Sequence, residues 1–348
     1  MKKTAAIILI IIMVFALCSC EAPTGYESSS QTDTHHTEQT ESTDQENSNK
    51  KGNGQNITQT GFTKPLPDEY LRQADQQGTI NELTYKSKDY TGDMSAISKK
   101  AYIYLPYGYD PNDSDKKYDI MYLMHGLGGT AEQAFTEYEG AGKNLIDNMI
   151  QNDVIKPMIF VSATFTEDDQ PQDDLFLSMT EMLSFHRDFI QNLMPAVESS
   201  YHTYAQSTSD NDLKASRTHR AFGGFSLGGV ATWQEFALDS DYISCFLPMS
   251  GPYRWFSGST DSQSKAVCDT LESVVERHHL DERGYFIYAC TGTEDELEPQ
   301  IDIQLDAMLK RSDVFTPEHL VYYKMKGGKH DMYAALNFIY NALPLFFQ

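Results

Sequence analysis

Short hydrophobic runs and longer amphipathic segments alternate along most of the chain. Three strand-like runs come first, at 80–85, 101–105 and 120–124, and after them strands and helices are predicted in alternation. The further strands are predicted at 158–161, 221–225, 243–248, 285–290 and 320–323, and the helices at 141–152, 180–200, 229–238, 263–279, 298–310 and 332–342. This alternation implies crossover connections, and therefore an α/β fold with a mostly parallel central sheet flanked by helices on both faces. In open sheets of this kind, functional residues follow the carboxyl ends of the strands.

The first residues of the chain have a different pattern. Two lysines precede an uncharged apolar run over residues 5–17, which has the length of a signal-peptide core and is short for a membrane-spanning helix of about 20 residues. The run ends in Leu-Cys-Ser-Cys, which resembles a bacterial lipobox. By that resemblance Cys20 is diacylated and becomes the mature N-terminus of an exported protein held at the cell membrane. Ordinary signal cleavage is the alternative.

A polar segment separates this leader from the globular part. Residues 21–63 are rich in Ser, Thr, Gln, Asn and acidic side chains, and such a segment cannot bury enough apolar surface to offset its ordering entropy. We therefore divide the chain into a lipoprotein signal peptide at 1–20, a disordered polar linker at 21–63, and one catalytic domain at 64–348.

Charge and cysteine content exclude several classes of function. The chain carries 50 acidic and 27 basic side chains, a net charge of −23, which repels nucleic acid and anionic lipid headgroups. We therefore expect no nucleic-acid partner, and membrane contact through the lipid anchor only. Three cysteines follow the leader region, Cys245, Cys268 and Cys290, and their spacing does not suggest a zinc site. We therefore expect no metal site.

The sequence Gly-Phe-Ser-Leu-Gly at 224–228 matches the GxSxG pattern of a nucleophile elbow. A strand-like run leads into it and a helix-like segment leads out, which is the context that this motif requires. The elbow forces Ser226 into a strained turn, and it leaves the Leu227 N–H free at a helix start to meet an oxyanion. These features predict Ser226 as the nucleophile.

A serine hydroxyl needs a base, and the base needs an acid to orient it. His330 follows the last predicted strand and comes last in the order Ser, acid, His, so we predict it to be the general base. The loop after the 285–290 strand carries two candidate acids, Glu294 and Asp295. The residues themselves leave the choice between them open.

The oxyanion hole needs a second N–H donor. The sequence His-Gly-Leu-Gly-Gly at 125–129 follows a predicted strand, and its glycines let the backbone approach a substrate closely. We assign the Leu127 N–H as the partner of the Leu227 N–H. His125 is interpreted as a structural residue of this loop.

Several stretches together resemble one known family. The matching stretches are 122–129, 222–228, 246–251, 291–295, 327–330 and 340–344. They span about residues 80–348 and resemble the feruloyl esterase branch of carbohydrate esterase family 1, the esterase D-like hydrolases. The resemblance implies an α/β-hydrolase fold, a Ser-His-Asp triad without a cofactor, and Asp295 as the acid. Relatives often have Ser-Gly-Asp-Ser-Trp after the sixth strand, whereas this chain has Ser-Gly-Pro-Tyr-Arg-Trp at 250–255.

The expected function is hydrolysis of carboxylic esters through an acyl-enzyme, with feruloylated or acetylated xylan as the ester substrate. Trp255 lies beside the expected cleft, where an exposed aromatic ring would stack on a phenolic acyl group or on a sugar. Trp233 is expected to pack in the core. The alternatives are a siderophore or small acyl-ester hydrolase and, from another class, a catalytically inactive glycan-binding lipoprotein. Export disfavours an S-formylglutathione hydrolase.

Overall fold

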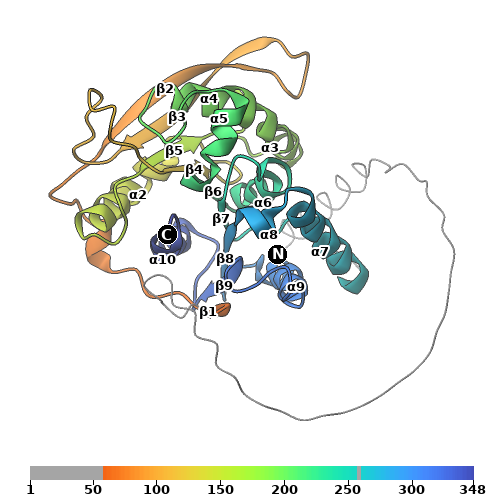
Figure 1. Ribbon diagram of the computed structural model, residues 1–348. Coiled ribbons are helices and arrows are strands. Elements are labelled where there is room, and N and C mark those ends of the chain that lie inside the picture. The colour runs from red at the N-terminus through yellow and green to blue at the C-terminus, as the bar shows by residue number, and fades with distance from the viewer. Residues whose placement is uncertain (1–57, 257–259) are drawn as a thin grey trace, which may run out of the picture.

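A single mixed sheet forms the centre of the molecule (Figure 1). The structure, a computed structural model, describes residues 58–256 and 260–348. Within them, nine strands are ordered β1-β9-β8-β7-β6-β4-β5-β3-β2. The strands are β1 (Thr60–Phe62), β2 (Thr79–Lys88), β3 (Ala96–Leu105), β4 (Ile120–Met124), β5 (Ile159–Ala163), β6 (Arg220–Phe225), β7 (Cys245–Met249), β8 (Phe286–Gly292) and β9 (Leu320–Met325). β3 runs antiparallel to both β2 and β5, and the other neighbours are parallel, which confirms the predicted fold class.

Helices cover both faces of this sheet (Figure 1). α2 and α10 pack on one face, and α3, α6, α7 and α9 pack on the other. The helices are α2 (Gln133–Gln151), α3 (Leu175–Asp188), α4 (Met194–Glu198), α5 (Asp210–Ala215), α6 (Leu227–Asp239), α7 (Thr260–Arg277), α8 (Leu280–Arg283), α9 (Glu298–Leu309) and α10 (Met332–Ala342). None of the helices in the described ranges is long and apolar enough to cross a bilayer.

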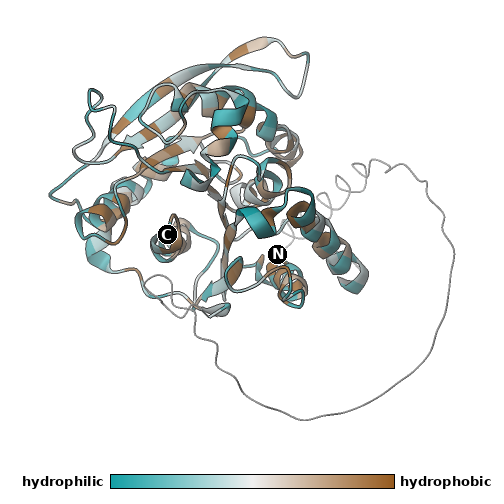
Figure 2. Cartoon of the chain, in the orientation of Figure 1, coloured by the Kyte–Doolittle hydropathy of each residue, from teal (hydrophilic) through white to brown (hydrophobic). Residues whose placement is uncertain are grey.

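The central strands are hydrophobic on both sides because both faces of the sheet are covered. β4, β5 and β7 are buried along their whole length, and Figure 2 shows the middle of the sheet mostly in hydrophobic colours. Along β6, Ala221 packs on the α2 and α10 side while Phe222 packs on the α6 side. The residue after β6 therefore leaves the core at the carboxyl edge of the sheet, between the two helical layers.

Two sequence-based expectations need correction. We expected the polar linker to continue to residue 63, but Thr60–Phe62 forms β1, which pairs with the edge strand β9. An edge strand has unpaired backbone groups, and even a short polar segment can satisfy them. We also expected the first long helix to begin at 141. α2 begins at Gln133 instead and is interrupted at residues 137–140, so the prediction found the part that follows the interruption.

Candidate active site

Ser226 occupies a tight turn between β6 and α6. Its φ of 60° and ψ of −117° lie outside the regions that side chains ordinarily adopt, a conformation that costs about 1–3 kcal/mol. The flanking glycines make the turn possible, because a Cβ on Gly224 would lie 2.6 Å from the backbone of Gly228. The Ser226 N–H donates to the Met249 carbonyl oxygen at 2.9 Å, which ties the turn to β7. The strain therefore holds the Ser226 side chain at the carboxyl edge of the sheet.

His330 and Asp295 meet beside this turn. His330 Nδ1 lies 3.0 Å from each carboxylate oxygen of Asp295. The imidazole ring also packs against Phe225, the residue before Ser226, with ring centroids 4.6 Å apart. The Ser226 hydroxyl is not hydrogen-bonded to His330 in this structure, and catalytic hydrogen bonds often tighten when substrate binds. Glu294, the rival acid, is exposed to solvent.

The environment of Asp295 favours its charged form. Burial would raise the pKa of this carboxyl, but the hydrogen bond and charge of His330 outweigh it, so the pKa lies below its ordinary value. The Leu297 N–H donates to Asp295 Oδ1 at 2.8 Å, and the Ser250 hydroxyl lowers the pKa further. A carboxylate held in this way can keep the imidazole in one tautomer, with Nδ1 protonated and Nε2 free to accept a proton.

The loop after β4 lies next to the Ser226 turn because β4 and β6 are neighbours in the sheet. A Cβ on Gly126 would lie 3.2 Å from Ser226 Cβ, so the absence of a side chain at Gly126 allows this approach. The Leu127 and Leu227 N–H groups, which we expect to form the oxyanion hole, donate to no residue that the structure describes. Both amides are therefore available to an incoming ligand.

The segment between β5 and α3 accepts two hydrogen bonds from the loop after β4. The Gly128 N–H donates to the Gln172 carbonyl oxygen at 3.1 Å, and the Ala131 N–H donates to the Asp169 carboxylate at 2.7 Å. Burial raises the pKa of Asp169, and the hydrogen bond from Ala131 acts in the opposite direction. The roles of Asp169 and Gln172 could not be predicted from the sequence, because a polar loop gives no signal of which distant backbone groups it contacts.

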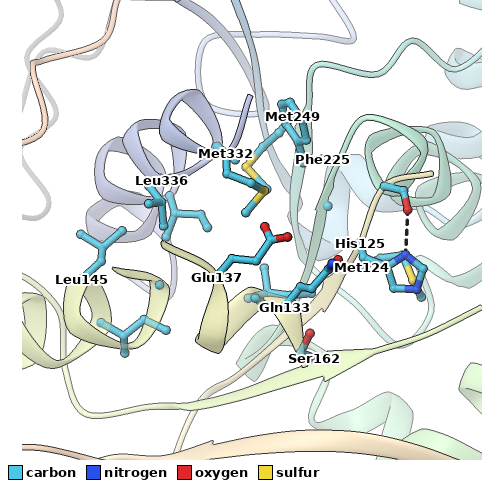
Figure 3. Close-up of a pocket in the computed structure, with 18 residues that line it drawn as sticks. Met124, His125, Gln133, Glu137, Leu145, Ser162, Phe225, Met249, Met332 and Leu336 are labelled. Atoms are coloured by element: carbon cyan, nitrogen blue, oxygen red, sulfur yellow. Dashed lines mark hydrogen bonds between the residues drawn. The ribbon is translucent and has the colours of Figure 1, made fainter. Parts of the chain in front are cut away.

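His125 has the structural role that its motif suggested. Nδ1 lies 2.8 Å from the Gly126 carbonyl oxygen (Figure 3). Nε2 lies 2.8 Å from Thr164 Oγ1, so both ring nitrogens are occupied. Burial lowers the pKa of His125 to about 4, and the ring packs against Phe165. A neutral, fully hydrogen-bonded imidazole fixes the start of the loop.

The two tryptophans lie on the α6 side of the sheet. Trp233 is buried, and its Nε1–H donates to the Gly251 carbonyl oxygen at 3.0 Å, which anchors the loop after β7. Trp255 is half-buried against the same hydrophobic cluster, and so is less exposed than we expected. Packing against this cluster leaves part of its ring accessible to a ligand.

Other candidate chemistry is sparse. In the described ranges, no group of three or more His, Cys, Asp or Glu side chains is arranged to hold a metal ion. Cys245, Cys268 and Cys290 carry free, buried thiols, and burial raises the pKa of Cys245 to about 11. Cys20 lies outside the residues that the structure describes.

Residues 97–338 match the family described as "Putative esterase". This chain belongs to that esterase family. It is 35% identical over 290 residues to endo-1,4-beta-xylanase Y of Acetivibrio thermocellus, a match that covers 82% of this chain and 24% of the relative. It is also 28% identical over 179 residues to an endo-1,4-beta-xylanase/feruloyl esterase of Xylanibacter ruminicola, which covers 50% and 22%. The esterase thus spans about a quarter of the length of these curated relatives.

Solved structures extend this comparison. A serine-to-alanine mutant of the feruloyl esterase module from Clostridium thermocellum, in complex with sinapinate, is 33% identical to this esterase, with a TM-score of 0.70. The match covers 82% of this chain and 94% of that module. A ferulic acid esterase from Anaeromyces mucronatus shares the fold at 18% identity and a TM-score of 0.60. The family and the near-complete overlap with the module identify this esterase as a serine carboxylesterase.

Proposed function

We propose that this esterase removes feruloyl or acetyl groups from plant xylan. The observation that carries the proposal is the match to a feruloyl esterase module, because it covers nearly all of that module and not a fragment. The curated relative that is 35% identical is a xylanase, so its substrate is the polysaccharide that carries such esters. The half-buried Trp255 supports a sugar or aromatic contact beside the cleft.

The proposed mechanism proceeds through an acyl-enzyme. His330 takes the proton of the Ser226 hydroxyl as its oxygen attacks the ester carbonyl carbon, and Asp295 holds the imidazole and stabilises its charged form. The Leu127 and Leu227 amides stabilise the tetrahedral oxyanion. His330 then returns the proton to the leaving alcohol, and water releases the acid in a second round of the same steps. The hydrogen bond from His330 to Asp295 supports this assignment of roles.

A substrate panel tests the proposal. The purified protein is given methyl ferulate, acetylated xylan, a catecholate siderophore and p-nitrophenyl acetate, and initial rates are compared. We expect kcat/KM to be highest for methyl ferulate or acetylated xylan. A higher value for the siderophore would assign the protein to the alternative substrate class. Failure to turn over p-nitrophenyl acetate or any other ester would favour a catalytically inactive glycan-binding protein.

We also propose that the protein is exported and anchored through lipid on Cys20. The proposal rests on the two lysines, the apolar run and the Leu-Cys-Ser-Cys sequence. Two acyl chains hold a protein stably at a membrane, whereas one chain binds weakly. Mass spectrometry of the mature N-terminus is the test, with Cys20→Ala as the control. We expect diacylglycerol on Cys20, and an unmodified N-terminus beyond this residue would indicate a protein that is only secreted.

A further inference from the structure

α2 is broken next to the candidate active site. Glu137 leaves the helix with a ψ of 155°, and Tyr138, Glu139 and Gly140 follow with φ values of 51°, 58° and 81°. Consecutive left-handed residues that are not glycine are uncommon, and strain of this kind gathers at functional sites. The break turns Tyr138 and Glu139 out to solvent, whereas Glu137 is half-buried and points inward.

Glu137 points into an apolar cavity of about 80 Å³ between α2, α10 and the sheet (Figure 3). The walls include Leu145 from α2, Leu336 and Ile339 from α10, and Met249 from β7. Figure 3 shows the Glu137 carboxylate directed from α2 toward the Met332 side chain. Placing a carboxylate among apolar side chains costs free energy, so packing alone does not explain the position of Glu137.

The cavity lies close to the nucleophile, although Ser226 itself does not line it. Gly126 and Phe225 line it, and a Cβ on Gly126 would lie 3.7 Å from Ser226 Oγ. Met332, another lining residue, follows His330 closely in the sequence. A group attached to an ester carbon at Ser226 therefore has the cavity within its reach.

No hydrogen bond or ion pair joins the Glu137 carboxylate to another residue among 58–256 and 260–348, and its oxygens are not sealed from solvent. Burial raises its pKa, and no neighbouring cation offsets this effect. A ligand hydroxyl can take the place of water as the donor to this carboxylate, and hydrogen bonds to charged groups contribute more than those between neutral groups. The cavity is thus suited to an apolar group that carries one hydroxyl.

We infer that Glu137 is a specificity-determining residue: the cavity takes the aromatic ring of a hydroxycinnamoyl ester, and the Glu137 carboxylate accepts a hydrogen bond from the phenolic hydroxyl. This inference rests on the proposed function, since it names the acyl group that the same site selects. An acetyl group is too short to fill the cavity and has no hydroxyl to donate to the carboxylate. Among the two acyl groups proposed, the cavity favours the feruloyl group.

The side chains that line the cavity can move to admit an aromatic ring. An engineered cavity of about 150 Å³ binds benzene, so a ring needs more room than this cavity of about 80 Å³ offers. Met124, Met249 and Met332 line the cavity, and unbranched thioether side chains change rotamer easily. We expect these methionines to move aside as the ring enters, while Glu137 stays on the α2 side.

The test compares two esters that differ by one hydroxyl, methyl 4-hydroxycinnamate and methyl cinnamate. We expect the wild-type protein to prefer the phenolic ester in kcat/KM by about tenfold to a hundredfold, as for a hydrogen bond to a charged group. Glu137→Leu should reduce this preference to near unity. Glu137→Gln keeps an acceptor oxygen and should retain part of it. Binding of 4-hydroxycinnamate against cinnamate to the Ser226→Ala protein, by calorimetry, should give the same ranking.

Glu139→Leu is the matched control, because Glu139 lies in the same strained turn but faces solvent. We expect it to keep the wild-type preference. Three results would overturn the inference about Glu137 while leaving the proposed function standing. The preference could survive in Glu137→Leu, fall equally in Glu139→Leu, or be absent from the wild-type protein. If the wild-type protein hydrolyses p-nitrophenyl acetate but no cinnamoyl ester, the feruloyl assignment is overturned together with it.

Discussion

The two sides of the catalytic cleft differ in how their side chains are held. On the side of β6, β8 and β9, Ser226 is fixed by a strained turn and His330 by a carboxylate 3.0 Å from its Nδ1. On the side of α2, the helix is broken, Glu137 has no described partner, and methionines line the adjoining cavity. Bond making requires fixed distances, whereas recognition of an acyl group tolerates walls that adapt. The following experiments test this division between a rigid reacting side and an adaptable recognition side.

The largest effect is expected from the nucleophile. Ser226→Ala should lower kcat by about 10⁴-fold or more for every ester, because it removes the attacking oxygen and leaves the acyl cavity intact. Circular dichroism and thermal unfolding should match the wild type within experimental error. Activity within a few-fold of the wild type would show that another residue attacks the ester.

The second largest effect is expected from the acid that orients His330. Asp295→Asn keeps the shape of the side chain but loses the charge that orients His330, so kcat should fall by about 10³–10⁴-fold. Glu294→Gln changes an exposed neighbour on the same loop and should stay within about tenfold, or roughly 1.4 kcal/mol. Both variants are measured on p-nitrophenyl acetate after their folding has been checked. The reverse ranking would transfer the role to Glu294.

A smaller effect is expected at Asp169, in the segment between β5 and α3 that is hydrogen-bonded to the loop after β4. Asp169→Ala removes the acceptor for the Ala131 N–H, and we expect kcat to fall by about tenfold, less than the 10²–10³-fold loss of an oxyanion donor. KM should change little. Asp169→Asn can still accept the hydrogen bond and should recover most of the rate, and Asp168→Ala, next to it and exposed, serves as the control. Equal losses in all three variants would argue against a positioning role.

The smallest effect is expected at Trp255, on the face opposite the Glu137 cavity. If the acyl ring enters that cavity, Trp255 is left to contact the sugar. Trp255→Ala should then raise KM for a feruloylated oligosaccharide by about two- to twelvefold, the equivalent of roughly 0.5–1.5 kcal/mol of stacking. The increase should exceed that for methyl ferulate. The opposite order would place the acyl ring beside Trp255 and weaken the proposed role of Glu137.

The reacting side of the cleft could be predicted from the sequence, and the recognition side could not. The elbow around Ser226 requires glycines at fixed positions, so its geometry leaves a pattern that can be read directly. The order of strands then indicates which loops carry His330 and its acid, and the structure brings His330 together with Asp295.

Glu137 shows why the recognition side of the cleft could not be predicted from the sequence. The sequence around it has the composition of an ordinary helix, and nothing local indicates three left-handed residues after it. The cavity that it faces is formed by residues from distant elements, and tertiary contacts decide both features. Asp169 is a similar case, because its partner Ala131 is far away in the sequence. The short β1 was also assigned to the linker, since pairing with an edge strand leaves no hydrophobic pattern.

The most direct test of the account is to trap the covalent intermediate. The wild-type protein is incubated with an alkyl fluorophosphonate, which reacts with a serine only when a neighbouring base activates it. The protein is then digested, and the modified peptide is located by mass spectrometry. We expect one adduct, on the peptide that contains Ser226, with labelling slowed strongly in Asp295→Asn and abolished in Ser226→Ala. An adduct on another serine, or unchanged labelling in Ser226→Ala, would contradict the assignment of Ser226 as the activated nucleophile.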